Sequence, residues 1–314
     1  MLRSPPRYSD PNLPPLDDAD RRLVDALVAD GRASGRDLAQ QTGISEANVS
    51  RRLARLVEER SIRIAGFVPP EILGLEVQFV TFMRVKGSVD DAAQALVAHP
   101  EFTWLSGLFG SWDLVGYGVV QDTVALNEFI DRAIRSNPMF RYVQTEVVLA
   151  FEGTGRQPDS KRVAREVDQS DRLIIREVQR DGRVSFSDIA TRTGISATSA
   201  ADRFRRLVSE GTLRILCIPD PVRVDLTLSG SLGCVLSRPI AEVMPALRAV
   251  PELAFLSTST GPCPIRSEFH VADERAMDGM RNRLLAIPGV DDVELSIYRR
   301  LYKQTFEWHA PQAQ

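Results

Sequence analysis

The 314-residue chain has little cysteine or histidine and no long apolar run, and each shortage argues against a class of protein. Its three cysteines, Cys217, Cys234 and Cys263, form an odd set without CxxC spacing, which fits reduced thiols better than a disulfide framework or a zinc site. No stretch approaches about 18 uncharged apolar residues, and the N-terminus has no apolar segment of the signal-peptide kind. We therefore expect a folded cytoplasmic protein with no membrane span and no metal.

Common catalytic signatures are also missing, because the sequence contains no GxGxxG, GxxxxGK[ST], HExxH or GxSxG. Of its three histidines, His99 precedes Pro100 at an expected helix end, where an exposed position is usual, and His270 alternates along an expected strand. His309 lies near the C-terminus. These features predict no enzymatic activity and no cofactor.

Charge is distributed unevenly along the chain. Residues 1–65 contain 11 Lys and Arg against 10 Asp and Glu, 66–152 contain 5 against 11, 153–216 contain 13 against 9, and 217–314 contain 10 against 12. Two neutral or basic blocks thus each precede an acidic block. This pattern is typical of a chain in which two segments face a polyanion and two do not.

The alternation reflects an internal repeat. Residues 16–64 match residues 167–215 at 20 of 49 ungapped positions, including Asp30-Gly31-Arg32 with Asp181-Gly182-Arg183 and Thr42-Gly43-Ile44-Ser45 with Thr193-Gly194-Ile195-Ser196. Farther along, Gly110 meets Gly261 in the same register. The chain is therefore a tandem duplication.

Each basic block predicts three helices with a turn at a glycine. The first helix covers about 18–29, the second follows a capping Ser34, and the third follows Ser45 after Gly43. This is the helix-turn-helix pattern, and the alternation at 61–64 and 67–68 predicts the strands of a wing. Each acidic block predicts the order βαββαβ, with strands at 77–85, 102–109, 114–120 and 142–151 in the first copy.

The fold class we expect is α+β, with two repeats of a winged helix-turn-helix followed by a ferredoxin-like βαββαβ domain. The expected domains are a flexible tail (1–15), a first winged helix-turn-helix (16–68), a first βαββαβ domain (69–152), a linker (153–167), a second winged helix-turn-helix (168–220) and a second βαββαβ domain (221–314).

The arginines of the third helix suggest contact with DNA, because residues at the start of this helix reach base edges in such motifs. Arg51 and Arg55 are four residues apart and should share a face, whereas we expect Arg52, which has the equivalent Arg203, to form a structural ion pair. A solvated amphipathic helix is the alternative. The candidate DNA-binding residues are Ser45, Asn48, Ser50, Arg51, Arg55, Arg203 and Arg206.

The run LDxxDRxLVxxLxxDGRxSxxDLAxxTGIS…RRLxRL, followed by a βαββαβ domain, resembles the Lrp/AsnC transcriptional regulators over about 300 of the 314 residues. The resemblance implies a helix-turn-helix that binds double-stranded DNA and a second domain, called RAM, that dimerises through its sheet. It also implies a small effector, often an amino acid, bound at loops between RAM domains. We expect face-to-face pairing of the two RAM sheets within the chain, and further homo-oligomers.

The family's Gly-x-x-Asp effector loop falls on Gly110 and Asp113, where Asp113 suits an ammonium group and Trp112 an apolar side chain. The alternative is a tight turn in which Asp113 caps backbone and Trp112 packs on a neighbour. The second copy departs from the pattern, since its loop reads Gly261-Pro262-Cys263-Pro264 and Asp202 replaces Arg51. We therefore expect weaker DNA binding and no effector site in that copy.

Two rival functions remain from the sequence. Sirohaem decarboxylases resemble this family and also occur as fused units, although the expected segment rich in histidine and arginine is absent here. A ligand-binding scaffold without DNA activity is the other alternative.

Overall fold

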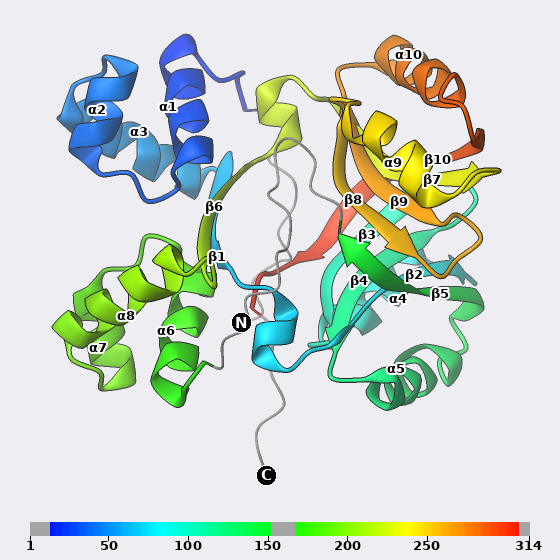
Figure 1. Ribbon diagram of the computed structural model, residues 1–314, viewed down its shortest axis with the longest axis horizontal. Coiled ribbons are helices and arrows are strands. Elements are labelled where there is room, and N and C mark those ends of the chain that lie inside the picture. Colours follow the sequence, from blue (N-terminus) through cyan, green and yellow to red (C-terminus); the bar gives the residue numbers. More distant parts are fainter. Residues whose placement is uncertain (1–12, 152–166, 308–314) are drawn as a thin grey trace.

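The computed structural model describes residues 13–151 and 167–307, and within them the sequence repeat forms two similar units (Figure 1). We call residues 16–151 unit 1 and residues 167–307 unit 2. Each unit begins with three helices, which we call its head, and continues into a four-stranded sheet with helices on one face. Most of the expected tail and linker, and His309, lie outside the described residues.

The elements of unit 1 are α1 (Asp18–Ala29), α2 (Gly35–Thr42), α3 (Glu46–Glu58), β1 (Ile62–Phe67), the 3-10 helix η1 (Pro70–Leu73), β2 (Val77–Val85), α4 (Val89–Val97), β3 (Phe102–Phe109), β4 (Leu114–Val120), α5 (Thr123–Ile130), the π-helical η2 (Asp131–Arg135) and β5 (Phe140–Phe151). The elements of unit 2 are α6 (Gln169–Arg180), α7 (Phe186–Thr193), α8 (Ala197–Ser209), β6 (Arg214–Pro219), the 3-10 helix η3 (Pro221–Val224), β7 (Leu228–Leu236), α9 (Ile240–Arg248), β8 (Leu253–Ser259), β9 (Ile265–Val271), α10 (Glu274–Leu285) and β10 (Val290–Gln304).

Local signals explain the head helices. The side chain of Ser34 accepts a hydrogen bond from the Asp37 backbone at the start of α2, and Gly43 ends that helix with a left-handed φ of 71°. Ser45 stands at the start of α3, as expected, but its side chain makes no capping hydrogen bond. Its counterpart Ser196 does cap α8, by accepting from the backbone of Ser199.

The expected wings are wrong, because the strand after each head pairs with its counterpart in the other unit. β1 and β6 form a two-stranded antiparallel sheet, in which Ile64 lies opposite Cys217. The alternating apolar residues of these strands need a buried face, and they find it in the heads. The core of head 1 includes Cys217 from unit 2, and the core of head 2 includes Val68 and Leu73 from unit 1.

The two larger sheets have the expected βαββαβ order, but they join edge to edge rather than face to face. β5 pairs with β8, and β3 pairs with β10, so that eight strands close into a barrel of order β10-β3-β4-β2-β5-β8-β9-β7. Helices α4 and α5 pack on the outside of one half, and α9 and α10 on the other, each over its own hydrophobic core (Figure 1). The barrel leaves no open edge in either sheet.

The two heads hold each other through a reciprocal pair of arginines. Each guanidinium reaches two carbonyl oxygens in the first loop of the other head: Arg32 donates to Gly182 (3.0 Å) and Val184 (2.8 Å), and Arg183 donates to Gly31 and Ala33 (both 3.0 Å). Burial lowers the pKa of both arginines below their ordinary value. The two heads are thus fixed relative to each other around a pseudo-twofold axis.

We expect Arg32→Ala and Arg183→Ala each to lower the free energy of unfolding by about 1.5–3 kcal/mol, because each change removes two charge-assisted hydrogen bonds between the heads. Urea denaturation measures this loss, and hydrogen exchange at residues 182–184 should accelerate in Arg32→Ala. The control is Arg36→Ala on the exposed face of α2, which should change stability by less than about 0.5 kcal/mol. Equal losses of stability in all three variants would contradict the stabilising role of the reciprocal arginines.

Candidate functional site

The outward face of α3 carries three of the predicted DNA-binding residues. Asn48, Ser50 and Arg51 are exposed at its N-terminal end, while Val49 between them is buried in the head. The Arg51 guanidinium donates to Asn48 Oδ1 at 2.8 Å, so the two side chains lie together at the surface. This arrangement presents donors and an acceptor that match the edges of bases in a major groove.

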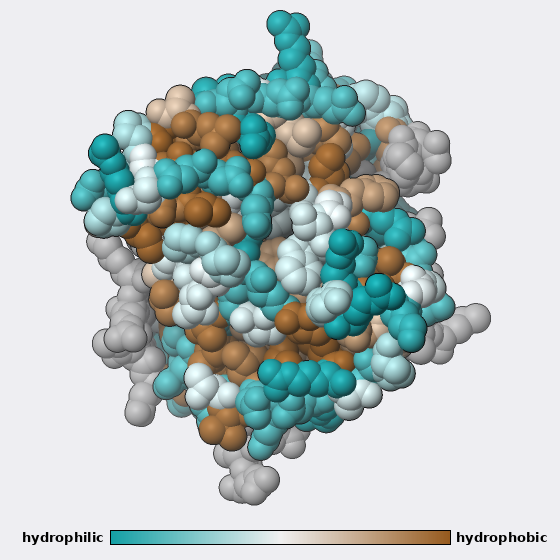
Figure 2. All heavy atoms as spheres, turned by 90° about the vertical axis from the view of Figure 1, so that its right-hand side faces the viewer, coloured by the Kyte–Doolittle hydropathy of each residue, from teal (hydrophilic) through white to brown (hydrophobic). Residues whose placement is uncertain are grey.

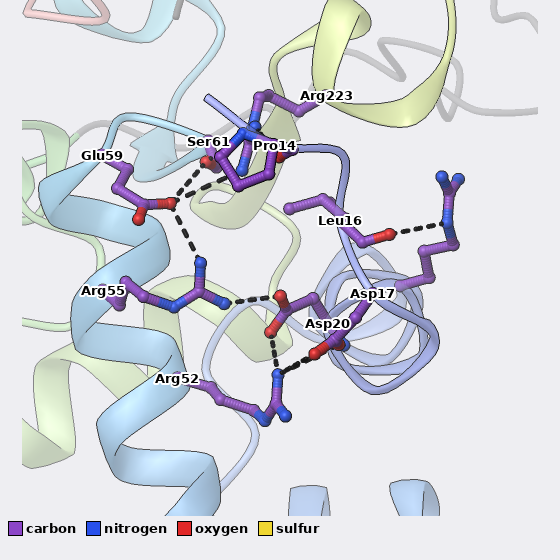
Figure 3. Close-up of polar contacts among 10 residues, drawn as sticks. Pro14, Leu16, Asp17, Asp20, Arg52, Arg55, Glu59, Ser61 and Arg223 are labelled. Carbon is purple, nitrogen blue, oxygen red and sulfur yellow. Dashed lines mark hydrogen bonds and ion pairs between the residues drawn. The ribbon is translucent and has the colours of Figure 1, made fainter. Parts of the chain in front are cut away.

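The Arg55 side chain, four residues after Arg51 on α3, is engaged with carboxylates of its own head, and its contact with DNA stays a prediction. Figure 3 shows Arg52 and Arg55 both turned toward Asp20 of α1. Arg55 approaches Asp20 to 2.5 Å and Arg52 approaches it to 2.8 Å, with a further contact from Arg52 to Asp17. These hydrogen bonds raise the pKa of both arginines, and Asp20 has only 4% of its side chain exposed.

Head 2 repeats this arrangement. Arg203 donates to Asp171 at 2.9 Å and to Asp168, and Arg206 approaches Asp171 at 3.1 Å. Arg203 and Arg206, predicted to bind DNA, therefore face α6 instead of the outside. Both arginines and both aspartates are identical in the two copies of the repeat. This identity in the sequence was the signal that Arg55, like Arg52, forms a structural ion pair.

Sequence reasoning missed the link from this cluster to unit 2. Glu59 contacts Arg55 at 3.1 Å and Arg223 of η3 at 3.5 Å, and the Arg223 Nε donates to Ser61 Oγ at 2.9 Å (Figure 3). Arg223 also donates to the backbone of Pro14, and only 3% of it is exposed. No local pattern marks Arg223, because its partners are about 160 or more residues away in the chain.

The outward face of head 2 has an anion at the position that Arg51 occupies in head 1. Asp202 stands where Arg51 does, and it is paired with Arg205 on the same helix at 2.8 Å, with both side chains at least 60% exposed. The neighbouring Ala200 is buried, and Ala201 offers no hydrogen-bonding side chain. The two heads therefore present different chemistry to a polyanion.

The hinge loop between β3 and β4 contains the predicted effector residues. Asp113 Oδ2 accepts a hydrogen bond from the backbone of Val85 at 2.8 Å, and its other oxygen lies 3.5 Å from Arg84. The Trp112 ring packs 5.9 Å from that of Phe82. Gly110 has a φ of 151°, which few other residues adopt, and a side chain there would collide with Ser296 of β10. The turn is thus held by its own contacts, and a role in effector binding stays a prediction.

The described residues show neither a disulfide nor a metal-binding cluster. The three cysteines are free and buried, as expected, and burial raises the pKa of each thiol to about 12. Among residues 13–151 and 167–307, no three His, Cys, Asp or Glu side chains gather in a way that would hold a metal ion. In the same ranges no helix has the length and apolar character needed to cross a bilayer.

Comparison with known proteins identifies the parts of the chain. Family models match residues 16–57 as an AsnC-type helix-turn-helix domain, 79–156 as an Lrp/AsnC ligand binding domain and 167–214 as a winged helix-turn-helix DNA-binding domain. The HTH-type transcriptional regulator FL11 of Pyrococcus abyssi is 32% identical over 136 residues, which are 43% of this chain and 89% of that protein. The leucine-responsive regulatory protein of Escherichia coli is 27% identical over 151 residues, covering 46% of this chain and 92% of that protein.

A solved structure matches nearly the whole fold. The siroheme decarboxylase NirDL has a TM-score of 0.61 and covers 92% of this chain and 93% of its own, with 14% sequence identity. This likeness shows that the fused two-unit fold occurs elsewhere.

We expect Asp20→Ala to lower the free energy of unfolding by about 2–4 kcal/mol, because it leaves two partly buried guanidinium groups without their shared carboxylate. The matched control is Asp18→Ala, which removes an exposed carboxylate from the same helix turn. Asp18→Ala and Arg51→Ala should each change the free energy of unfolding by less than about 0.5 kcal/mol. Chemical denaturation of the three variants checks this order, and equal losses in Asp20→Ala and Asp18→Ala would contradict it.

Proposed function

Because this chain belongs to the Lrp/AsnC family of DNA-binding transcriptional regulators, we propose that head 1 is its principal DNA reader and that a small effector modulates binding. The observation that carries the first part is the difference between the outward faces of the heads. Head 1 offers Arg51 with Asn48, whereas head 2 offers Asp202 already paired with Arg205. We propose that the protein works at the chromosome, in the cytoplasm.

In this proposal the N-terminal end of α3 enters a major groove. Arg51 and Asn48 meet base edges, and Ser45 and Ser50 are close enough along the helix to meet bases or phosphates. Arg55 holds α3 against α1 and meets DNA only if it leaves Asp20. The paired β1 and β6 strands fix the spacing of the heads, so that both meet one duplex at a set distance. Two unequal heads suit an asymmetric operator.

We expect Arg51→Ala to weaken specific DNA binding by about 1–3 kcal/mol if the guanidinium reads a base. Asp202→Arg should strengthen binding and steepen its dependence on salt, because it replaces an anion near phosphate with a cation. Gel shifts over a salt series, on operators found by genomic mapping of binding sites, measure both effects. Arg275→Ala on the exposed face of α10 is the control and should leave affinity unchanged. Unchanged affinity in both head variants would refute head 1 as the reader.

The effector we propose is an amino acid or another small polar molecule, held at the first hinge loop. The support is the loop's composition: Gly110 permits close approach of the backbone, Asp113 keeps 29% of its side chain exposed, and Trp112 offers an apolar surface. In the second loop Pro262 and Pro264 remove two backbone donors, and the loop contains no acidic residue of its own at the position of Asp113.

Calorimetric titration with a panel of amino acids tests the effector proposal. Asp113→Ala should abolish the binding seen with the unaltered protein, because it removes the acceptor for an ammonium group. Pro262→Ala, the matched change in the second loop, should leave binding intact. A ligand retained by Asp113→Ala and lost on altering Gly261 would assign the site to the second loop instead.

We also propose that the chains assemble further, so that two copies of head 1 meet a palindrome. Figure 2 shows that the face of the barrel turned away from the heads carries hydrophobic areas between hydrophilic ones. Val124, Tyr142 and Leu149 are each more than 60% exposed in the barrel domain, and in this proposal a second copy of the chain covers them.

The alternative of a sirohaem decarboxylase-like enzyme is supported by the fold of NirDL alone. The best candidate for a catalytic residue is His270 of β9. Its Nδ1 lies 2.7 Å from Ser229 Oγ, and Glu268 lies 3.8 Å from the other ring nitrogen. These contacts describe a packed histidine, and we propose that the chain is not an enzyme. Addition of an iron porphyrin with measurement of haem-type absorbance separates the two functions, and a salt-dependent gel shift separates the regulator from a scaffold without DNA activity.

A further inference from the structure

The two hinge loops take equivalent places against the other unit, but they meet different residues there. A side chain on Gly110 would collide with Ser296 of β10, and one on Gly261 would collide with Glu146 of β5. Glu146 pairs with Val80 in its own sheet, and Ser296 pairs with Ser231, the repeat counterpart of Val80. Glu146 and Ser296 therefore occupy the same position in the two units.

A second position differs in a complementary way. Arg266 of β9 pairs with Gly233, and its counterpart Val115 of β4 pairs with Phe82, the counterpart of Gly233. The glycine is needed for the arginine, because a Cβ at position 233 would lie 2.3 Å from the Arg266 guanidinium. Unit 2 thus has a cation, and room for it, where unit 1 has two apolar side chains.

These two differences meet across the boundary between the units. Arg266 binds Glu146 in a bidentate pair, with Nε 2.9 Å and Nη2 2.5 Å from the carboxylate oxygens. Ser259 Oγ and Gln144 Nε2 donate to the same carboxylate at 2.9 and 2.7 Å. Glu146 is 1% exposed and Arg266 8%, and the guanidinium lies 4.6 Å above the Phe82 ring. At the other, pseudo-symmetric contact, Val115 and Ser296 stand in their places.

We propose that the Glu146–Arg266 pair selects the pairing of unit 1 with unit 2 and excludes the pairing of like units from two copies of the chain. Pairing of two first units would bury Glu146 opposite Val115, and pairing of two second units would bury Arg266 opposite Ser296. Pairing of two first units leaves two buried Glu146 carboxylates without a cation, which is strongly unfavourable. Pairing of two second units leaves each Arg266 only the exposed Glu294 of its own unit at 3.5 Å, whereas the unlike pairing gives Arg266 and Glu146 their buried bidentate contact. The contact surface of unit 1 is therefore complementary to that of unit 2 and not to that of another unit 1.

The test exchanges units between full-length chains. Glu146→Ser and Arg266→Val each install the counterpart residue, and each alone should lower the Tm by about 5–15 °C because it leaves one buried charge unpaired. The double variant within one chain should melt above either single variant, because it contains no unpaired buried charge, and below the original, because Arg266→Val leaves space beside Gly233. When the two single variants are refolded together, unit 1 of the Arg266→Val chain should pair with unit 2 of the Glu146→Ser chain, because this exchange restores the original pair.

A disulfide across the β5–β8 boundary reports that exchange independently of other contacts between chains. Ala150 and Thr258 are neighbours in this register, so Ala150→Cys is placed in the Arg266→Val chain and Thr258→Cys in the Glu146→Ser chain. We expect roughly tenfold more covalent dimer than from the same two cysteines in chains that keep Glu146 and Arg266, since only in the single variants does the unexchanged state contain an unpaired buried charge that exchange removes. Single variants as stable as the original, or equal yields of covalent dimer, would overturn the proposal.

A second engineered disulfide reports the pairing of like units. Phe109 neighbours Ile297, and in a pair of first units Val147 takes the place of Ile297. A chain carrying Phe109→Cys and Val147→Cys should give no covalent dimer on refolding, and the same chain with Glu146→Ser and Arg266→Val should give one. Dimers in the first chain, or none in the second, would also overturn the proposal.

Discussion

Closure of the barrel across the boundary between the units is the constraint on which the rest of the molecule depends. Each four-stranded sheet has two edge strands whose backbone groups need partners, and the other unit supplies both. Once β5 meets β8 and β3 meets β10, the strands β1 and β6 are brought together, and with them the two heads. The cores of the heads then draw residues from both units, so neither helix-turn-helix motif has a core built from one unit alone.

Duplication gives this chain an internal comparison that separates structural residues from residues free to diverge. The aspartate and arginine cluster of α1 and α3 is repeated in α6 and α8 with the same contacts, as expected of groups that hold a helix in place. The reciprocal Arg32 and Arg183 follow the same rule. Two pairs of equivalent positions differ between the copies: Arg51 and Asp202 at the surface, and Val115 and Arg266 in the interior. Divergence at these positions gives the two halves of a nearly symmetric fold different partners.

The sequence predicted the elements well and their partners poorly. Capping residues and periodicity are local, and they placed α1 at 18–29 and three strands of unit 1 at the residues observed. The short helices η1 and η3 and the π-helical turn at 131–135 were not foreseen, although Pro70 and Pro221 mark the starts of the two 3-10 helices. The wing was predicted wrongly because an alternating strand shows that it needs a partner, but not which one. Arg55 and Arg223 likewise found carboxylates that spacing on one helix could not reveal.

The last strand of the chain reaches back into the first unit. β10 runs past its own sheet, and Tyr302 near its end is fully buried in the core of unit 1, where its hydroxyl contacts Asp90. During synthesis, domains generally fold in order from the N-terminus. Because Tyr302 belongs to the core of unit 1, we expect this core to stay incomplete in a nascent chain until β10 has been synthesised and can pack against it. Truncation near the C-terminus would therefore damage the half of the protein that is made first.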